Sequence, residues 1–138
     1  MPAPRAFEYA VVRVVPRVER EEFINAGVIV FCDAEDYLAA RVELDEARLL
    51  ALYPDADVAL IRRHLEAIPR LCEGGPAAGP IGALPIRERW RWLTSPKSTI
   101  LQTSPAHAGL TRALEEVLAR LLSEVVTPRS GRGLRRSS

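Results

Sequence analysis

Polar side chains gather around the stretch EEFINAGVIVFC, residues 21–32, which then becomes almost wholly apolar. Glu22 and Asn25 are three residues apart, as on one helical turn, and Arg13 lies in the preceding apolar segment. A carboxylate, an amide and a guanidinium can together bind a phosphate, a carboxylate or the backbone of a partner. A structural interpretation is also open, because Gly27 can occupy a turn where a side chain would clash, while Asn25 bonds the nearby backbone.

A second group of candidate residues lies in RERWRWLTSPKSTILQTSPAHAGLT, residues 87–111. Trp90 and Trp92 are two apart, so they cannot share one face of a helix. One of them must therefore be less buried and can stack on a ring or on a partner. Lys97 is the only lysine of the chain, and hydroxyl side chains follow it at Ser98 and Thr99. A lysine beside hydroxyls can hold a phosphate, although a lone cation is also common at a strand edge.

The two histidines do not form a recognisable catalytic motif. Neither His64 nor His107 has a hydroxyl residue two places on, as a two-histidine phosphoesterase requires. Gly-x-Ser-x-Gly, His-Glu-x-x-His, Cys-x-x-Cys and dinucleotide fingerprints are absent from the sequence. Cys32 and Cys72 have no further ligand at metal-binding spacing and suit small buried hydrophobes. We therefore expect no catalytic residue, no cofactor and no metal site, and the enzyme hypothesis is the weaker one.

Composition bounds the class of protein. The chain has 138 residues, of which 48% are hydrophobic, enough for one domain with a core. It lacks an apolar run of about 20 residues, the length of a membrane span, and its first residues do not resemble a signal peptide. These features predict a cytoplasmic protein that does not enter the membrane. They leave the oligomeric state open.

The last eleven residues form a basic tail. PRSGRGLRRSS, residues 128–138, contains four arginines and no acid, so we expect disorder there and a single domain over residues 1–127. Without those four arginines, fifteen basic residues oppose eighteen acids. The domain is therefore not a nucleic-acid binder by its bulk charge, and only the tail is expected to touch phosphates, weakly and without sequence preference.

Hydrophobic periodicity predicts the elements that position these residues. The predicted strands are residues 7–15, 26–32, 37–44 and 98–103. The second of them is apolar on both faces, as expected of a covered central strand. Short links between the first three strands indicate an α+β fold, with a mostly antiparallel sheet of about four strands and helices packed on one face.

Four helices are predicted between and after these strands. Asp45 is expected to cap a helix that ends near Tyr53, and Asp55 or Asp57 to start a second helix, which bends or restarts at Pro69. The Gly- and Pro-rich residues 74–85 are predicted to form a flexible loop. The remaining helices are expected to run from Pro85, with Ile86, Trp90 and Leu93 inside, and over residues 108–126, with Leu110 and Leu114 in the buried stripe.

Two stretches of the chain together resemble a bacterial family known only as a domain of unknown function. The stretches are YAVVRVVP…EEFINAGVIVF and RWRWLTSPKSTILQTSP, within residues 7–126. The residues that carry the resemblance are Arg13, Pro16, Glu22, Phe23, Asn25, Gly27, Val28, Trp90, Ser95, Pro96 and Gln102. Glu21 stands where similar proteins often have a small turn residue. The resemblance implies a small protein encoded beside a HipA-like serine/threonine kinase, with no established activity and no catalytic residue.

Two hypotheses follow. In the first, the protein is a non-catalytic interaction or accessory partner of a HipA-like kinase, an antitoxin-like modulator that makes contact through a polar rim and one tryptophan. In the second, it is an enzyme or a ligand-binding domain for phosphorylated or nucleotide substrates. There Glu22 is a base, His107 an acid, and the anion is held by Arg13, Lys97, Ser98 and Thr99. The second hypothesis predicts that these side chains converge in one pocket, and the first that they spread over a surface.

Overall fold

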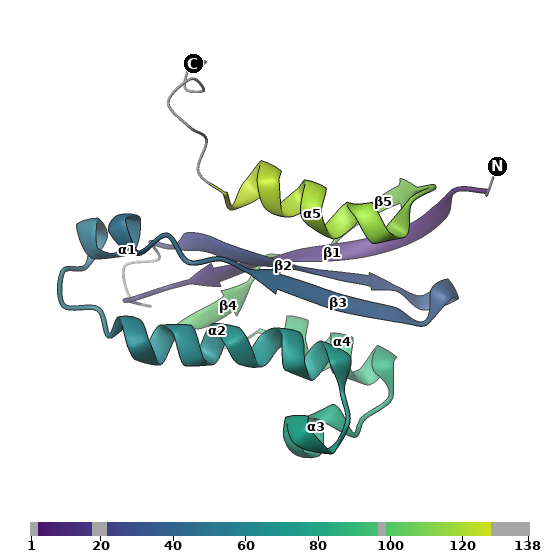
Figure 1. The fold of residues 1–138 in the computed structure, drawn as a ribbon, viewed down its shortest axis with the longest axis horizontal. Helices are drawn as coiled ribbons and strands as arrows, with labels where there is room; N and C mark the ends of the chain where they lie inside the picture. Colours follow the sequence, from purple (N-terminus) through teal and green to yellow (C-terminus); the bar gives the residue numbers. More distant parts are fainter. Residues whose placement is uncertain (1–2, 18–21, 97–98, 128–138) are drawn as a thin grey trace.

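An antiparallel sheet runs through the middle of the molecule in the computed structural model, which describes residues 3–17, 22–96 and 99–127 (Figure 1). The strand order is β3-β2-β1-β4, and β5 also pairs with β1. The strands are β1 Arg5–Val14, β2 Ile24–Cys32, β3 Tyr37–Val42, β4 Leu101–Thr103 and β5 His107–Thr111. Along β1, β4 pairs with residues 12–14 and β5 with residues 5–9, so the two short strands share one edge of the sheet. The α+β class and the antiparallel sheet are confirmed.

Helices cover both faces of this sheet. Helices α2 (Val58–Glu73) and α4 (Ile86–Thr94) lie below it and α5 (Leu114–Val125) lies above it in the view of Figure 1. Ile29 of β2 packs in the cluster with α2 and α4, and Val28 packs in the cluster with α5. The expected arrangement with helices on one face therefore holds for α2 and α4, and for α1 (Glu46–Leu52), whose Leu49 packs in the same cluster, but not for α5. The physical reason is β2 itself, whose apolar side chains on both faces require a cover on each side.

Side-chain caps begin the two helices that follow β3. Asp45 accepts a hydrogen bond from the amide of Arg48 at the start of α1 (Glu46–Leu52), and Asp57 accepts one from Leu60 at the start of α2. Helix α2 continues through Pro69 to Glu73 without a restart. Ile68 and Cys72 remain buried on either side of the proline, so packing against the sheet holds this helix together.

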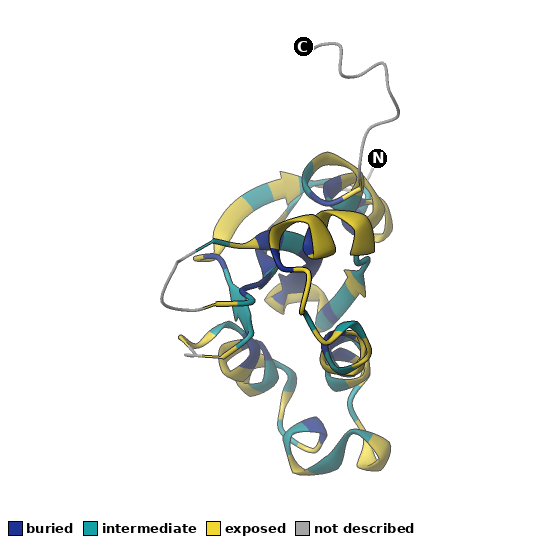
Figure 2. Ribbon diagram, turned by 90° about the vertical axis from the view of Figure 1, so that its left-hand side faces the viewer, coloured by how far each residue is buried: buried dark blue, intermediate teal, exposed yellow. Residues whose placement is uncertain are grey.

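The predicted flexible loop, residues 74–85, contains two short helical segments. They are a 3₁₀ turn at Pro76–Ala78 and α3, Gly79–Gly82. A further 3₁₀ turn, Asp33–Glu35, links β2 to β3. Figure 2 shows exposed residues on the outer sides of the helices and on β5, and buried residues on the central strands and on the inner sides of the helices.

The long final helix was predicted to begin too early. Residues 107–111 form β5, and α5 begins at Leu114. Leu110, expected inside, is 70% exposed. Gly109 lies under Phe7, where a Cβ would be 2.6 Å from the Phe7 ring, so pairing with β1 overrides the helical spacing of the leucines. The expected tail, residues 128–138, lies outside the described residues, as do residues 18–21. Within the described part of the chain, the helices are too short or too polar to cross a membrane.

Candidate functional site

A row of polar side chains crosses three neighbouring strands. Arg13 of β1 is the register partner of Asn25 in β2 and of Gln102 in β4. Directly opposed residues of antiparallel strands project from the same face, so the three belong to one surface. Arg13 is an even number of residues from Phe7, which packs in the α5 cluster, so this surface is the α5 face. We call Arg13, Asn25 and Gln102 the polar row.

Arg13 stacks on an aromatic ring and has spare hydrogen-bonding capacity. Its guanidinium carbon is 4.2 Å from the centroid of the Phe23 ring, a cation–π contact. Phe23 is 44% exposed, so the far face of this pair reaches the surface. The Nε atom of Arg13 is buried and has no hydrogen-bond partner among the described residues. Unpaired buried donors are rare in folded proteins, so this one marks a position where an acceptor is needed.

Asn25 connects the polar row to the end of α5. Its Nδ2 donates to the backbone oxygen of Val125 at 3.1 Å, which satisfies one of the carbonyls left free at a helix C-terminus. Because a carbonyl can only accept, this bond fixes the orientation of the amide and leaves Oδ1 as an acceptor. That Oδ1 is buried and unpaired within the described structure. The expectation that Asn25 bonds the backbone of the nearby connection is wrong, because the backbone oxygen that it bonds belongs to α5, 100 residues away.

Glu22 and Gly27 have structural contacts of their own. The hydroxyl of Tyr53 donates to Oε1 of Glu22 at 2.5 Å, which ties the entry of β2 to the end of α1. Gly27 lies inside β2, not in a turn. A Cβ there would be 2.8 Å from the backbone oxygen of Arg41 in β3, where the β1–β2 register shifts between Val12 and Arg13. Glycine is needed because the strands approach closely.

The remaining described candidates lie elsewhere. Trp90 is 5% exposed and stacks on Phe31 with ring centroids 5.3 Å apart, whereas Trp92 is 40% exposed. The prediction that one tryptophan is less buried is confirmed, and it is Trp92.

His107 pairs with Tyr9, and their ring centroids are 5.1 Å apart. Tyr9 is four residues from Arg13, roughly 13 Å along the strand. Neither Ser104 nor Thr111 bonds this histidine: their hydroxyls accept from Val11 and Ala113.

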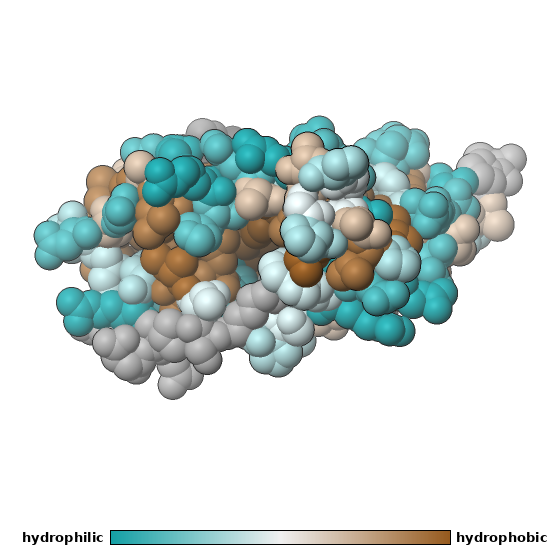
Figure 3. All heavy atoms as spheres, turned by 90° about the horizontal axis from the view of Figure 1, so that it is seen from below, coloured by the Kyte–Doolittle hydropathy of each residue, from teal (hydrophilic) through white to brown (hydrophobic). Residues whose placement is uncertain are grey.

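A cavity opens on the opposite face of the sheet. It has a volume of ≈ 400 Å³ and lies between α2, α4 and the start of β4. Thr99 and Gln102 are among its lining residues, and Lys97 and Ser98 lie outside the described residues. Figure 3 shows apolar side chains gathered on this side of the molecule.

The described residues do not provide a metal site, and the Cys72 thiol is not activated. Groups of three or more His, Cys, Asp or Glu suited to a metal ion do not occur among them. Burial raises the pKa of the Cys72 thiol to about 12, although Arg89 favours the thiolate. A thiol with so high a pKa is a poor nucleophile near neutral pH. Burial also raises the pKa of Tyr37, and the charge of Arg41 opposes the shift.

The comparison with protein families covers both sequence stretches that form the site. A family model described as "Protein of unknown function (DUF3037)" matches residues 9–126. The chain belongs to the DUF3037 family. No curated protein and no solved structure shows significant similarity to it.

The DUF3037 match spans every residue of the polar row as well as Phe23. Of the residues predicted to form a polar rim, Arg13 and Asn25 are register partners, and Gln102, a further candidate, joins them. Glu22 accepts from Tyr53, and His107 contacts Tyr9. Sequence analysis identified Phe23 only as part of the family resemblance. Its position next to Glu22 was the one feature that could have marked it as a candidate site residue. Tyr53 and Ser104 gave no such signal, because their partners are distant in the sequence. Tyr53 bonds Glu22, 31 positions away, and Ser104 bonds Val11, 93 positions away.

Proposed function

We propose that this DUF3037 protein is a non-catalytic interaction module, an antitoxin-like accessory partner of a HipA-like serine/threonine kinase. The kinase is implied by the resemblance to proteins encoded beside such kinases. The observation that supports an interaction surface is the cluster of Arg13, Phe23 and Asn25. It combines an exposed ring, a buried donor and a buried acceptor, and both polar atoms lack partners within the described residues.

The chemistry of this cluster indicates what a partner offers. A carboxylate of the partner accepts hydrogen bonds from the Arg13 guanidinium, because a guanidinium can donate two parallel hydrogen bonds to one carboxylate. An N–H or O–H of the partner donates to Oδ1 of Asn25, which can only accept. An apolar side chain covers the exposed part of Phe23. Arginine and aromatic residues are the usual energetic anchors of protein interfaces.

The dispersal of the other candidates favours interaction over catalysis. A phosphate cradle with a base and an acid requires its side chains to converge. Glu22 is instead bonded to Tyr53, Thr99 lines the cavity, and His107 lies against Tyr9, four residues along β1 from Arg13. The described side chains therefore give little support to an enzyme acting on phosphorylated or nucleotide substrates.

The test is copurification of the full-length chain with the HipA-like kinase expected beside its gene. Three proteins are compared: wild type, Phe23→Ala, and Leu110→Ala as a control. Both variants shorten exposed side chains, and Leu110, 70% exposed, lies in β5, away from the polar row. We expect wild type and Leu110→Ala to retain the kinase and Phe23→Ala to bind at least about tenfold more weakly, as for an interface anchor.

The outcomes distinguish a wrong partner from a wrong contact surface. Loss of the kinase from all three proteins, including wild type, refutes the kinase as partner. Equal retention by all three refutes Phe23 as part of the contact. A kinase assay on the purified complex then measures modulation, with a change in phosphorylation rate expected only for the proteins that bind.

A further inference from the structure

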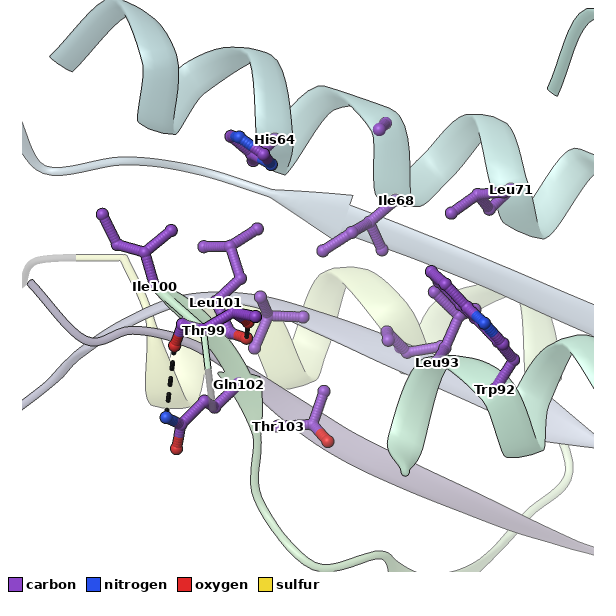
Figure 4. A pocket seen from close by; sticks show the side chains of 13 residues that line it. His64, Ile68, Leu71, Trp92, Leu93, Thr99, Ile100, Leu101, Gln102 and Thr103 are labelled. Carbon is purple, nitrogen blue, oxygen red and sulfur yellow. Dashed lines mark hydrogen bonds between the residues drawn. The ribbon is translucent and has the colours of Figure 1, made fainter. Parts of the chain in front are cut away.

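The cavity between α2, α4 and β4 has the architecture of a ligand pocket. Its floor is the sheet, at Val12 and Ile29, and the two helices and the edge strand form three walls (Figure 4). Its volume of ≈ 400 Å³ is at the small end of the roughly 300–1,000 Å³ that proteins use for small ligands. It lies on the sheet face opposite Arg13 and Asn25, and Gln102 of the edge strand is the one member of the polar row that also borders it.

The walls are predominantly hydrocarbon. Ile68 and Leu71 contribute from α2, Leu93 from α4, and Leu101 from β4. Trp92 lies on the α4 side and is 40% exposed, so this part of the lining reaches the surface. A space lined in this way binds an apolar body by removing its surface, and that of the walls, from water.

Besides Trp92, four polar side chains line the pocket: His64, Thr99, Gln102 and Thr103. In Figure 4, His64 and Thr99 lie on the side opposite Trp92, and Thr103 lies further along the edge strand, between that side and Trp92. The Thr99 hydroxyl already donates to the backbone oxygen of Leu101 at 2.7 Å. The imidazole of His64 and the hydroxyl of Thr103 form no hydrogen bond with the rest of the described chain. A few free polar groups in an apolar pocket orient a ligand that has one polar end.

We infer that this cavity binds a small amphipathic molecule, with a hydrocarbon body against the leucine and isoleucine side chains and one oxygen-bearing end towards His64 and Thr103. The shared chemistry is that of a medium-chain carboxylic acid or alcohol. The basic tail is a poor occupant, because it is rich in arginine and follows α5, which covers the opposite face.

The experiment titrates the full-length protein with decanoate, and in parallel with decanol, below the concentrations at which either aggregates. Calorimetry measures affinity and stoichiometry, and tryptophan fluorescence reports on the site because Trp92 lines the cavity while Trp90 is buried on Phe31. We expect saturable binding of one molecule of at least one probe, with a fluorescence change that disappears in Trp92→Phe. Butyrate, which has the same head group as decanoate and little body, should bind far more weakly.

Two matched substitutions on α2 locate the binding. Ala67 is half-buried and lines the cavity, and Ala59 is exposed on the same helix and does not. Ala67→Phe fills the pocket and should weaken binding by about tenfold or more, whereas Ala59→Phe should leave it unchanged. Thermal melting checks that both variants fold, and Ala67→Leu replaces Ala67→Phe if the larger residue prevents folding.

Two results would overturn the inference. The first is the absence of saturable binding of decanoate and of decanol by calorimetry. The second is equal affinity of wild type and the cavity-filling variant, which would mean that the probe binds elsewhere. Binding of decanoate but not decanol, or the reverse, supports the site and identifies the polar end that it accepts.

Discussion

Ser104 is the residue whose removal tests the structural reasoning most directly. It is 2% exposed and lies between β4 and β5, where the edge of the sheet passes from one strand to the other. Val11 of β1 donates its amide to the Ser104 hydroxyl at 2.9 Å and accepts from the Ser104 amide at 2.9 Å. The hydroxyl in turn donates to the backbone oxygen of Pro105. A side chain thus takes the place of a strand carbonyl at the point where pairing is interrupted.

Ser104→Ala leaves the buried amide of Val11 without an acceptor. An unsatisfied buried donor costs about 1–3 kcal/mol of unfolding free energy. For a chain of this length that corresponds to a decrease in Tm of about 3–10 °C. Ser123→Ala, at an exposed position of α5, is the matched control and should change the unfolding free energy by less than about 0.5 kcal/mol.

The assay is urea denaturation followed by circular dichroism, with hydrogen exchange at the Val11 amide as a local readout. We expect faster exchange at Val11 in Ser104→Ala and no change there in Ser123→Ala. If Ser104→Ala were as stable as the control, with Val11 still protected, the hydroxyl would not be completing the sheet edge and the reasoning would fail.

Three further predictions concern the candidate site and the core. Gly27→Ala should destabilise the fold by about 1–3 kcal/mol in urea titrations, because its Cβ would meet the backbone oxygen of Arg41. Asn25→Ala should cost about 1 kcal/mol and speed amide exchange in the last turn of α5, because it removes the bond to the Val125 carbonyl. The Cys72 thiol should resist alkylation in the native protein at pH 8. Its pKa is raised in the folded state from 9.0 to about 12, so the unfolded chain loses this proton first and stability should fall as the pH rises above about 9, a slope that Cys72→Ala reduces.

Each of these predictions has a result that contradicts it. A Gly27→Ala protein as stable as wild type would mean that β3 moves aside at no cost. Unchanged exchange in α5 of Asn25→Ala would mean that the amide does not hold the helix end. Rapid alkylation of Cys72 at pH 8 in the folded protein, or a pH slope unchanged in Cys72→Ala, would contradict its burial.

Local patterns were sufficient to predict most elements of the fold. The apolar run of β2, the alternation of β3, and the caps at Asp45 and Asp57 depend on neighbours within a few residues, so they can be predicted without knowing the rest of the chain. The same local argument failed at Leu110, where helical spacing of leucines continued into a segment that pairs with β1 as β5. Pairing with a strand about a hundred residues earlier has no local signature.

By itself, the sequence determined the α+β class, the double-sided burial of β2, and the difference in exposure between the two tryptophans, because these follow from periodicity along a single element. Only the tertiary structure decided which polar residues meet. Strand register places Arg13 beside Asn25 and Gln102, while Glu22 turns to Tyr53 and Thr99 faces the cavity on the other side. The physical reason is that a site is made by contacts between segments distant in the chain, and register and helix placement follow from burial of the whole core.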